Sequence, residues 1–596
     1  MSLDASHAEA GEKAEYEHVN KEPSSDGDQE TSVARGVQAN DIPAGYWYSF
    51  RILGSYAAIL LLACALFINY TMPASAITVI NAELGYSSSY IWISNASIVV
   101  TCVGTLIVGR LSDILGRRYF LIVGEVFGIV GAAIQAKATS INMLIAGSTI
   151  YGVANTTQLC FPYVLMELVP NKYRPLSQAI ITAIIVPFAG FGSIIARSMI
   201  SYTALGWRWV YMLNVVFNAA CLILLACFYF PPKLQHLHSG WTWRTELKKL
   251  DYGGIFFYSG MSALIVIALN WGGSTYPWKD AHVLGTLVVG CVLGIIFVVY
   301  EAFMPLEQPL LPLKLLKNRG YVCVVLCGCI GQMCLFALSI LWPQQIEYLY
   351  TTDNITIGWM SITTGLSLIV GEVIFGGLMR LLGNTRLQLI VASCMMFTFL
   401  AAMGGTTHKP QNYPLAFSTL AGFFSGWLDV IATVGNGLLN EPGDLGLANG
   451  FLGSMRQLIG AVSISIYVAI LSNRYPVNFA KDVSAAALGA GLPSGSLEAA
   501  LAAAANGTAA AFEAVPGMNA TIEMAITGGV KNAWSSSFST VYYSSLSFAG
   551  VAIICAYLSV DFSHNFTDYV NRRITGTEAE NVPVERTIKN RHLSDD

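Results

Sequence analysis

Long uncharged stretches constrain this chain of 596 residues more than any other feature. From Arg51 onward, stretches of about 20 residues follow one another, almost all with no charge or a single one, and this length spans a bilayer as a helix. Lipid offers the backbone no hydrogen-bond partner, so each stretch is expected to be helical. Charged residues make up only 11% of the chain, against roughly a quarter in soluble proteins. The sequence therefore predicts an all-α polytopic membrane protein.

Fourteen spans can be counted on this basis. They lie near residues 52–80, 90–109, 119–138, 143–165, 177–200, 209–230, 252–270, 282–301, 320–341, 356–378, 387–405, 413–436, 448–472 and 537–559. The alternate loops that begin with Arg110 hold fourteen Lys or Arg residues, whereas the opposite short loops hold four. Short basic loops stay in the cytoplasm, and an even number of crossings places both tails on one side. Both termini are therefore expected to be cytoplasmic.

A short pattern occurs twice. Gly109 and Gly116 stand seven positions apart after the second span, with a charged residue between them. Gly376 and Gly383 repeat this spacing after the tenth span, again with a charged residue between them. The pattern indicates two related halves of six spans. Secondary transporters are often doubled in this way, with a binding site at mid-membrane where the halves meet.

The chain is expected to divide into five parts. These are a disordered cytoplasmic tail (1–50), an N-terminal six-helix half (51–230), cytoplasmic loops with an inserted helix pair (231–319), a C-terminal six-helix half (320–560) and a second cytoplasmic tail (561–596). The first tail holds ten acidic and three basic residues without apolar periodicity. Residues 473–536 are rich in Ala and Gly but too polar to span, and are expected to be a large external loop with a short helix. The sequons at Asn354, Asn506 and Asn519 would face outward and are candidate glycosylation sites.

The first copy of the repeated pattern resembles a known signature. Gly109 to Arg118, with Arg110, Asp113, Gly116 and Arg117 in between, resembles the loop signature of the major facilitator superfamily. Further matches are Trp92, Gly152, Pro187 with Gly190, Trp207 to Trp209 with Asn214, and the tract from Leu250 to Gly254. The chain resembles the fourteen-span drug/proton antiporter-like branch and is most similar to the fungal trichothecene efflux pump group, over about residues 45–575. The resemblance implies the major facilitator fold, with two six-helix halves plus two inserted central helices.

The loop signature also has a physical reading that does not depend on the family. Gly109 lets two helices approach closely. Asp113 is placed to accept hydrogen bonds from helix-terminal N–H groups or to pair with Arg117 across the loop. Breaking and remaking that pairing would bias inward-open and outward-open states. Arg117 and Arg118 are expected to face anionic lipid, and the alternative for Arg118 is that it only fixes the topology.

Several positions depart from the antiporter pattern. Asn69 stands where the first-span motif begins with Asp, and an amide does not titrate. Ser148 stands where the fourth span has an arginine. Only Pro187 and Gly190 remain of the Gly-Pro and Gly-Gly pairs of the fifth-span motif. These departures place proton coupling in the N-terminal half in question.

Ionisable residues inside spans are costly and are therefore functional candidates. They are Glu125, Arg197, Glu372, Asp429 and Arg456. Asp429 is the first candidate for a titrating or substrate-contacting carboxylate, because its span lines the cavity by resemblance. Arg456 is its partner, a contact for an anionic substrate group, or half of a structural ion pair. Glu372 lies near the cytoplasmic interface, where it could snorkel, and Glu125 is interpreted as structural.

Uncharged polar side chains on the spans admit two readings. Asn69 and Gln332, together with Gln158 and Asn436, either orient a ligand or form hydrogen bonds between helices. The cysteine group of the ninth span, from Cys323 to Cys334, fits buried apolar packing better than a soft-metal path. No metal site is expected.

Three classes of function compete. The first is proton-driven export of an amphipathic small molecule such as a secondary metabolite, mycotoxin or drug. The second is uptake of an iron–siderophore complex on the same fold. The third, a membrane enzyme or channel, is disfavoured because the sequence has no nucleophile motif, metal-ligand spacing or phosphate loop. The chain is expected to be a monomer of the plasma membrane, with a vacuolar or vesicular membrane as the alternative. Its partners would be lipid, protons and a small molecule, without a cofactor or nucleic acid.

Overall fold

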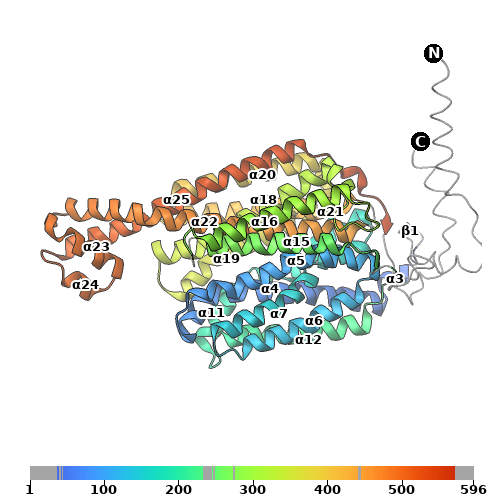
Figure 1. Ribbon diagram of the computed structural model, residues 1–596, viewed down its shortest axis with the longest axis horizontal. Coiled ribbons are helices and arrows are strands. Elements are labelled where there is room, and N and C mark those ends of the chain that lie inside the picture. The colour runs from blue at the N-terminus through green and yellow to red at the C-terminus, as the bar shows by residue number, and fades with distance from the viewer. Residues whose placement is uncertain are drawn as a thin grey trace, which may run out of the picture.

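The computed structural model describes residues 37–38, 42, 44–231, 245, 248–272, 276–440 and 444–570. Long helices lie side by side along one common direction and form a bundle (Figure 1). The strands in this part of the chain are β1 (Val37–Gln38) and β2 (Tyr569–Val570), which pair antiparallel and bring its two ends together. The prediction of an all-α fold is confirmed.

The N-terminal half is built from the helices between residues 44 and 228. They are α3 (Ala44–Trp47), α4 (Phe50–Leu84), α5 (Trp92–Leu115), α6 (Arg118–Ala136), α7 (Ile141–Gln158), α8 (Phe161–Leu168), α9 (Arg174–Ile184), α10 (Val186–Ala189), α11 (Gly192–Tyr202) and α12 (Arg208–Phe228), with 3-10 turns η2 (Ser88–Ile91) and η3 (Asn171–Tyr173). Ser49 and Ser140 cap α4 and α7 by accepting hydrogen bonds from first-turn N–H groups. α6 packs between α7 and α12, and α4 packs against α12.

The C-terminal half contains the longest helices. They are α17 (Leu313–Lys317), α18 (Arg319–Leu349), α19 (Asn354–Leu382), α20 (Thr385–Thr406), α21 (Asn412–Leu438), α22 (Leu445–Gly489), α23 (Leu497–Asn506), α24 (Ala509–Glu513) and α25 (Ala520–Leu558), with 3-10 turns η5 (Ser494–Ser496) and η6 (Ser563–Asn565). Asn318 and Asp353 cap α18 and α19. α22 packs against α25, α21 against α19, and α18 against α21, α22 and α25.

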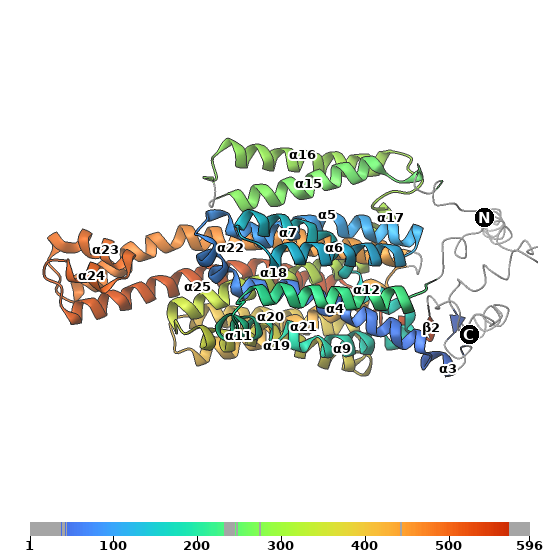
Figure 2. The ribbon, with the colours of Figure 1, turned by 90° about the horizontal axis from the view of Figure 1, so that it is seen from below.

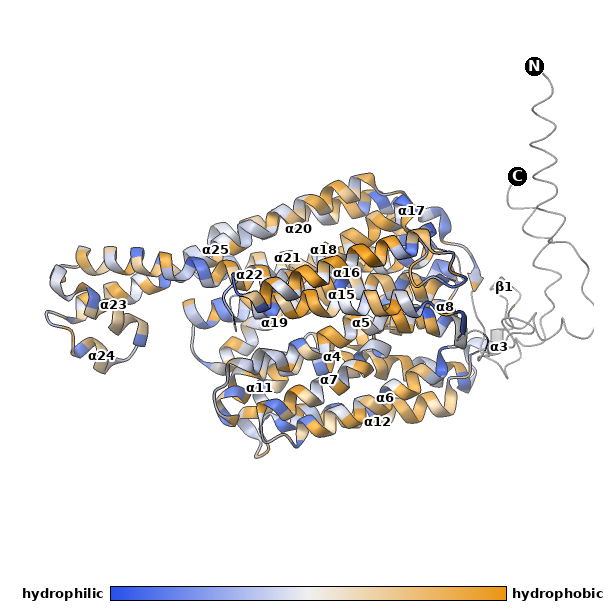
Figure 3. Ribbon diagram, viewed as in Figure 1, coloured by the Kyte–Doolittle hydropathy of each residue, from blue (hydrophilic) through white to orange (hydrophobic). Residues whose placement is uncertain are grey.

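The inserted pair consists of α15 (Tyr252–Trp271) and α16 (Ala281–Phe303). It lies on the outside of the bundle, and α15 packs against α5 and α22 (Figure 2). The Tyr258 and Ser454 hydroxyls share a hydrogen bond, and Asn95 donates to Asn270 at 2.5 Å. Apolar residues cover both helices, as expected of surfaces that face lipid (Figure 3).

Eleven helices in the described part are long and apolar enough to cross a membrane. The other three predicted spans coincide with α7, with α9 to α11, and with α18, whose apolar part Arg319–Leu335 is short. The number fourteen therefore stays a prediction.

Two predicted spans are helical but interrupted. The fifth span consists of α9, α10 and α11, with Pro187 in the first turn of α10 and Gly190 directly after it. Proline has no N–H to donate to the preceding turn, which favours a break at this place. The fourth span ends at Gln158, and the chain continues as α8.

Residues 473–536 are mostly helical rather than a loop with one short helix. α22 runs on to Gly489 and α25 already begins at Ala520, and both project beyond the rest of the bundle with α23 and α24 between them (Figure 1). Val483, Ala500 and Phe512 belong to a separate small apolar core in this extension. Alanine is the strongest helix former, so a stretch that is too polar for lipid still folds into helices.

The two halves meet along two sets of helices. α5 packs against α22, and α9 and α11 pack against α19. A Cβ atom at Gly109 would lie 2.5 Å from the carbonyl oxygen of Gly446 and 3.0 Å from the Cα of Gly450. A Cβ at Gly376 would lie 3.1 Å from the carbonyl oxygen of Pro175. Close contact between the backbones therefore requires glycine at Gly109, and it leaves little room for a larger residue at Gly376.

Candidate functional site

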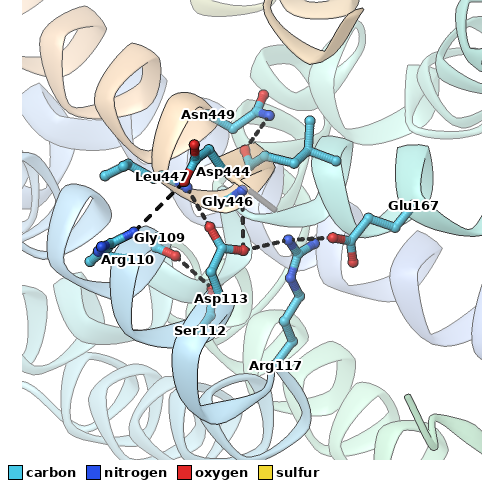
Figure 4. A network of polar contacts seen from close by, with 11 residues as sticks. Gly109, Arg110, Ser112, Asp113, Arg117, Glu167, Asp444, Gly446, Leu447 and Asn449 are labelled. Carbon is cyan, nitrogen blue, oxygen red and sulfur yellow. Dashed lines mark hydrogen bonds and ion pairs between the residues drawn. The ribbon is translucent and has the colours of Figure 1, made fainter. Parts of the chain in front are cut away.

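Asp113, near the end of α5, caps a helix of the opposite half. Its carboxylate accepts hydrogen bonds from the backbone N–H groups of Gly446 at 3.2 Å and Leu447 at 2.8 Å, in the first turn of α22 (Figure 4). First-turn N–H groups have no partner within their own helix, and the helix dipole favours a negative charge there. Helix capping, one of the two contacts considered for Asp113, is thus made between the halves.

Arg117 makes the second contact considered for Asp113. Its Nη2 lies 2.9 Å from Asp113 Oδ1 and 2.6 Å from Glu167 Oε1, and the guanidinium lies 4.4 Å from the centre of the Tyr163 ring (Figure 4). The Arg117 side chain is only 2% exposed, so the expectation that it faces lipid was wrong. Two carboxylates compensate the buried charge, which otherwise would be very costly. Glu167 was missed because nothing local in the sequence relates it to the loop.

The remaining residues of the loop signature have separate roles. Arg110 Nη1 lies 3.8 Å from Asp444 Oδ1, and Asp444 stands directly before α22. Gly116 has a φ of +91° in the turn between α5 and α6, a conformation that favours glycine. Arg118 contacts its own half, because it donates to the carbonyl of Ala226 at 2.8 Å and lies over the Phe230 ring. Asp113 and Arg110 thus join the two halves at this end of the bundle. Arg117 and Arg118 contact residues of their own half.

Asp429 and Arg456 form an ion pair inside the C-terminal half. Arg456 Nη2 on α22 lies 2.8 Å from Asp429 Oδ1 on α21, and the side chains are 16% and 25% exposed. From Ser425 to Leu438, every residue of α21 is buried except Asp429. Asp429 is thus the one residue of this stretch of α21 that keeps accessible surface. Arg456 is thus paired with Asp429, and whether the pair is structural or contacts the substrate stays a prediction.

Glu372 connects this ion pair to the N-terminal half. Its Oε2 on α19 accepts a hydrogen bond at 3.0 Å from the hydroxyl of Thr182 on α9. The carboxylate is bound inside the bundle and does not snorkel to the interface. Arg456 also donates to the Thr433 hydroxyl at 3.3 Å. Neither threonine was singled out from the sequence, because a single hydroxyl on an apolar helix gives no signal of its partner.

The three ionisable residues lie at similar depth. Glu372 and Asp429 precede the ends of α19 and α21 by ten and nine residues, and Arg456 follows the start of α22 by eleven. At about 1.5 Å per residue, each lies roughly 14–17 Å from that end, which is half of a hydrocarbon layer about 30 Å thick. The cluster can bind a proton or a polar ligand group in the middle of the membrane.

The other candidate residues are more dispersed. Asn69 accepts a hydrogen bond from Asn214 at 3.4 Å, and Gln332 is half-buried on α18. A Cβ at Gly190, directly after α10, would lie 3.1 Å from the Leu366 Cδ1 atom on α19. The end of α10 therefore faces α19.

The three sequons lie at helix ends. Asn354 begins α19, Asn506 ends α23 with its side chain exposed, and Asn519 caps α25 by accepting from Ile522 N–H at 2.8 Å. For the described residues, no group of three or more His, Cys, Asp or Glu side chains is placed to hold a metal.

Comparisons with known proteins agree with these features. A family model described as "Fungal trichothecene efflux pump (TRI12)" matches residues 15–585. A trichothecene efflux pump of Fusarium sporotrichioides is 29% identical over 553 residues, which cover 92% of each chain. An MFS-type transporter of Penicillium rubens is 29% identical over 460 residues, covering 76% of this chain and 81% of the relative.

A solved structure, that of a major facilitator superfamily proton:xylose symporter, is also similar. It superimposes with a TM-score of 0.48 at 15% sequence identity, over 73% of this chain and 89% of the other.

Proposed function

Because the chain belongs to the fungal trichothecene efflux pump family, a group of major facilitator efflux transporters, we propose that it exports a trichothecene-like amphipathic metabolite in exchange for protons. The efflux family does not favour the alternative of siderophore uptake. A transporter of this kind works by alternating access, in which the site between the two halves opens to one side of the membrane at a time.

The observation that carries the proposal is the cluster of Asp429, Arg456 and Glu372 at mid-membrane. Two acids and one base would leave a net negative charge in the bilayer when all are ionised. One bound proton makes the cluster neutral, which lowers the free energy of the state in which it is closed off from water. A proton taken up from outside would thus favour the return of the carrier.

Protonation of Glu372 would act directly on the contact between the two halves. As a carboxylate it accepts from Thr182 of the opposite half, whereas a proton on Glu372 weakens the charge that holds this hydrogen bond. Polar groups of the substrate would compete with the proton for the same carboxylates. Substrate and proton would then bind alternately, as antiport requires.

Asp113 is proposed to stabilise the closed state at the end of the bundle where α5 ends and α22 begins. Its contacts with Gly446 and Leu447 exist only while the halves touch there. In the proposed topology this end faces the cytoplasm, so the structure corresponds to a state that is closed toward the cytoplasm. Opening inward would break these contacts and leave Asp113 with Arg117 alone.

A vesicle assay tests the function. Purified protein in liposomes should accumulate a labelled trichothecene when a pH gradient is applied, and Asp429→Asn should reduce this accumulation by about tenfold or more while still inserting into the membrane. The matched control is Glu498→Gln, which neutralises an exposed acid on α23, far from the cluster. Equal accumulation with and without the gradient would refute proton antiport. No transport of any trichothecene would refute the substrate class.

The site of action also belongs to the proposal. We place the protein in the plasma membrane as a monomer with both termini in the cytoplasm and the extension around α23 outside, where Asn354, Asn506 and Asn519 can carry glycans. An epitope inserted at Gly507, an exposed turn, should be reached by antibody on intact cells. A signal only after permeabilisation would invert the topology.

A further inference from the structure

A buried polar network fills the middle of the N-terminal half. Glu125 on α6 is completely buried, with a relative exposure of 0%. Its Oε1 accepts a hydrogen bond at 3.1 Å from the side-chain amide of Gln158 on α7. The same amide donates to Asn218 on α12 at 2.9 Å. The carboxyl group therefore joins three helices.

The network continues to α4, so that it includes four helices of this half. Asn218 donates to Asn214 Oδ1 at 2.9 Å and to the Tyr151 hydroxyl at 3.2 Å. Asn214 in turn donates to Asn69 on α4 at 3.4 Å. Asn69 is only half-buried, whereas Asn214 and Asn218 have an exposure of 0%. A continuous set of polar groups thus leads from Glu125 to an accessible position on α4.

Small residues keep the network closely packed. A Cβ at Gly124 would lie 1.8 Å from Thr157 Oγ1, and a Cβ at Gly128 would lie 2.3 Å from Asn218 Oδ1. α6 therefore lies directly against α7 and α12 on both sides of Glu125, with no room for a lysine or arginine side chain to enter.

In the part of the chain that the structure describes, no Lys or Arg is paired with Glu125. The titratable groups that face it are the phenol of Tyr151 on α7 and the thiol of Cys221 on α12, with Cys64 of α4 facing Cys221. Phenols and thiols are uncharged at neutral pH. Arg117 precedes it by eight residues, about 12 Å along the helix axis, and is bound to Asp113 and Glu167. An ionised Glu125 would thus be an uncompensated charge in the bilayer.

The second carboxyl oxygen of Glu125, Oε2, is buried. Among the described residues it has no hydrogen-bond partner. A buried oxygen of this kind costs free energy unless it is protonated or binds water in another state. Gln158 and the asparagines do not titrate, so Glu125 is the single group of the network that can take up and release a proton at ordinary pH.

We propose that Glu125 is a proton-binding residue of the exporter, in the half where Asn69 stands at the position of the titratable aspartate of related antiporters. This inference rests on the proposed function. In the state described, the proton resides on Oε2. When the site opens to the cytoplasm, water enters along α4 past Asn69, takes the proton from Oε2 and leaves a carboxylate held by Gln158. Water from the outside returns a proton to Oε2 in the next cycle.

Transport with and without a gradient tests the inference. The probe is a labelled trichothecene in proteoliposomes, measured as accumulation driven by a pH gradient and as exchange at equal pH. Glu125→Gln keeps the shape and the hydrogen bond to Gln158 but cannot titrate. Gradient-driven accumulation should fall by about tenfold or more, while exchange stays within about twofold. Glu125→Asp should restore part of the coupling.

A matched control separates this role from packing. Gln135→Met removes a buried hydrogen bond to Ser148 between the same helices, α6 and α7, without touching a titratable group. Its pH profile should equal that of the unmodified protein. Unchanged accumulation and an unchanged pH profile in Glu125→Gln would overturn the inference.

A substrate-free measurement distinguishes this failure from failure of the proposed function. Infrared spectra of the purified protein should contain a protonated carboxylic acid band that disappears in Glu125→Gln but not in Gln135→Met. If no trichothecene is transported but this band is present, the substrate class is wrong and the proton site stands. If transport is normal but the band is unaffected by Glu125→Gln, the proton site is wrong.

Discussion

The two halves of the molecule place their charges differently. In the N-terminal half, Asp113, Arg117 and Glu167 gather at one end of the bundle, and its interior holds amides and Glu125. In the C-terminal half, the ion pair of Asp429 and Arg456 lies in the interior, beside Glu372. The two halves thus carry different chemistry.

The difference separates two tasks. Charges at the end of α5 touch the backbone of α22, so they respond to whether the halves are in contact. The charges at mid-membrane keep accessible surface inside the bundle, and we propose that they respond to protons and substrate. The contact from Glu372 to Thr182 joins the second group to the interface. If this division is correct, mutations in the interior should alter transport, and mutations at the end should alter the balance of conformations.

The largest effect on transport is expected from Arg456→Gln. The change leaves Asp429 without its cation, so transport should fall on the order of 100-fold. The protein should lose about 2 kcal/mol of stability, less than a fully buried pair, because the Asp429 side chain keeps 25% of its surface accessible. Vesicle transport and thermal unfolding in detergent measure the two quantities.

The double variant Asp429→Asn with Arg456→Gln tests whether the ion pair in the C-terminal half acts in transport or only stabilises the fold. It removes both charges, so stability should recover to near the original value while transport stays low. Recovery of transport together with stability would show that the pair merely holds α21 and α22 together.

The next effect concerns Asp113→Asn. The variant loses the charge that binds Arg117 and the first turn of α22, which is worth about 1–3 kcal/mol. The population closed at this end should fall by about tenfold or more relative to the open one. Arg118→Gln is the matched control, because Arg118 contacts only its own half.

Distances between spin labels measure this population. Tyr119→Cys on α6 and Leu381→Cys on α19 are exposed label sites in opposite halves, after replacement of the exposed Cys227 and Cys291 by serine. Asp113→Asn should add a longer distance that Arg118→Gln does not. The same distribution in both variants would remove the end charges from conformational control.

The sequence predicted local features of this arrangement well. Asp113 and Arg117 stand four positions apart in the loop signature, and their pairing across the loop was one of the two contacts that the sequence suggested for Asp113. The spans also followed, because apolar length and charge are local properties. The break at Pro187 could have been predicted as well, since proline lacks the N–H that an unbroken helix needs.

Contacts between distant segments could not be predicted in the same way. Glu167 reaches Arg117 only because α8 folds back on α5, and Thr182 reaches Glu372 from the opposite half. Glu125 was interpreted as structural because its span resembles the outer scaffold helices of the family, and its contact with Gln158 on another helix has no local signal in the sequence. The helices of the external extension were missed for another reason, since low hydrophobicity was weighed above the helix propensity of alanine.

A smaller effect is expected from Thr182→Val, which tests the connection between the two charge groups. The variant removes the hydrogen bond to Glu372 with little change in shape, and the loss of this bond costs about 1 kcal/mol of interaction free energy. The pH profile of transport should therefore shift, and the transport rate should change by several fold. Thr433→Val is the control, because Thr433 contacts Arg456 within one half. In combination with Glu372→Gln, Thr182→Val should have no further effect. Additive effects would mean that the two residues act separately.

The smallest effect is expected from Asp561→Asn. Asp561 is an acid at the end of the C-terminal half, and its described contacts lie within that half. The variant therefore tests whether any acid at this end of the bundle controls the conformation. Partial burial raises its pKa, but hydrogen bonds from Thr385 and Ser563 outweigh this and hold the pKa below the ordinary value. The carboxylate therefore stabilises the fold above its unfolded pKa of about 3.9, and this stability is lost as pH falls through the lower folded value. Asp561→Asn should lower the melting temperature slightly at pH 7 and reduce its decrease on acidification, while label distances and transport stay unchanged. A changed distance distribution would show that charge at this end of either half controls the conformation, and the division between the halves would then fail.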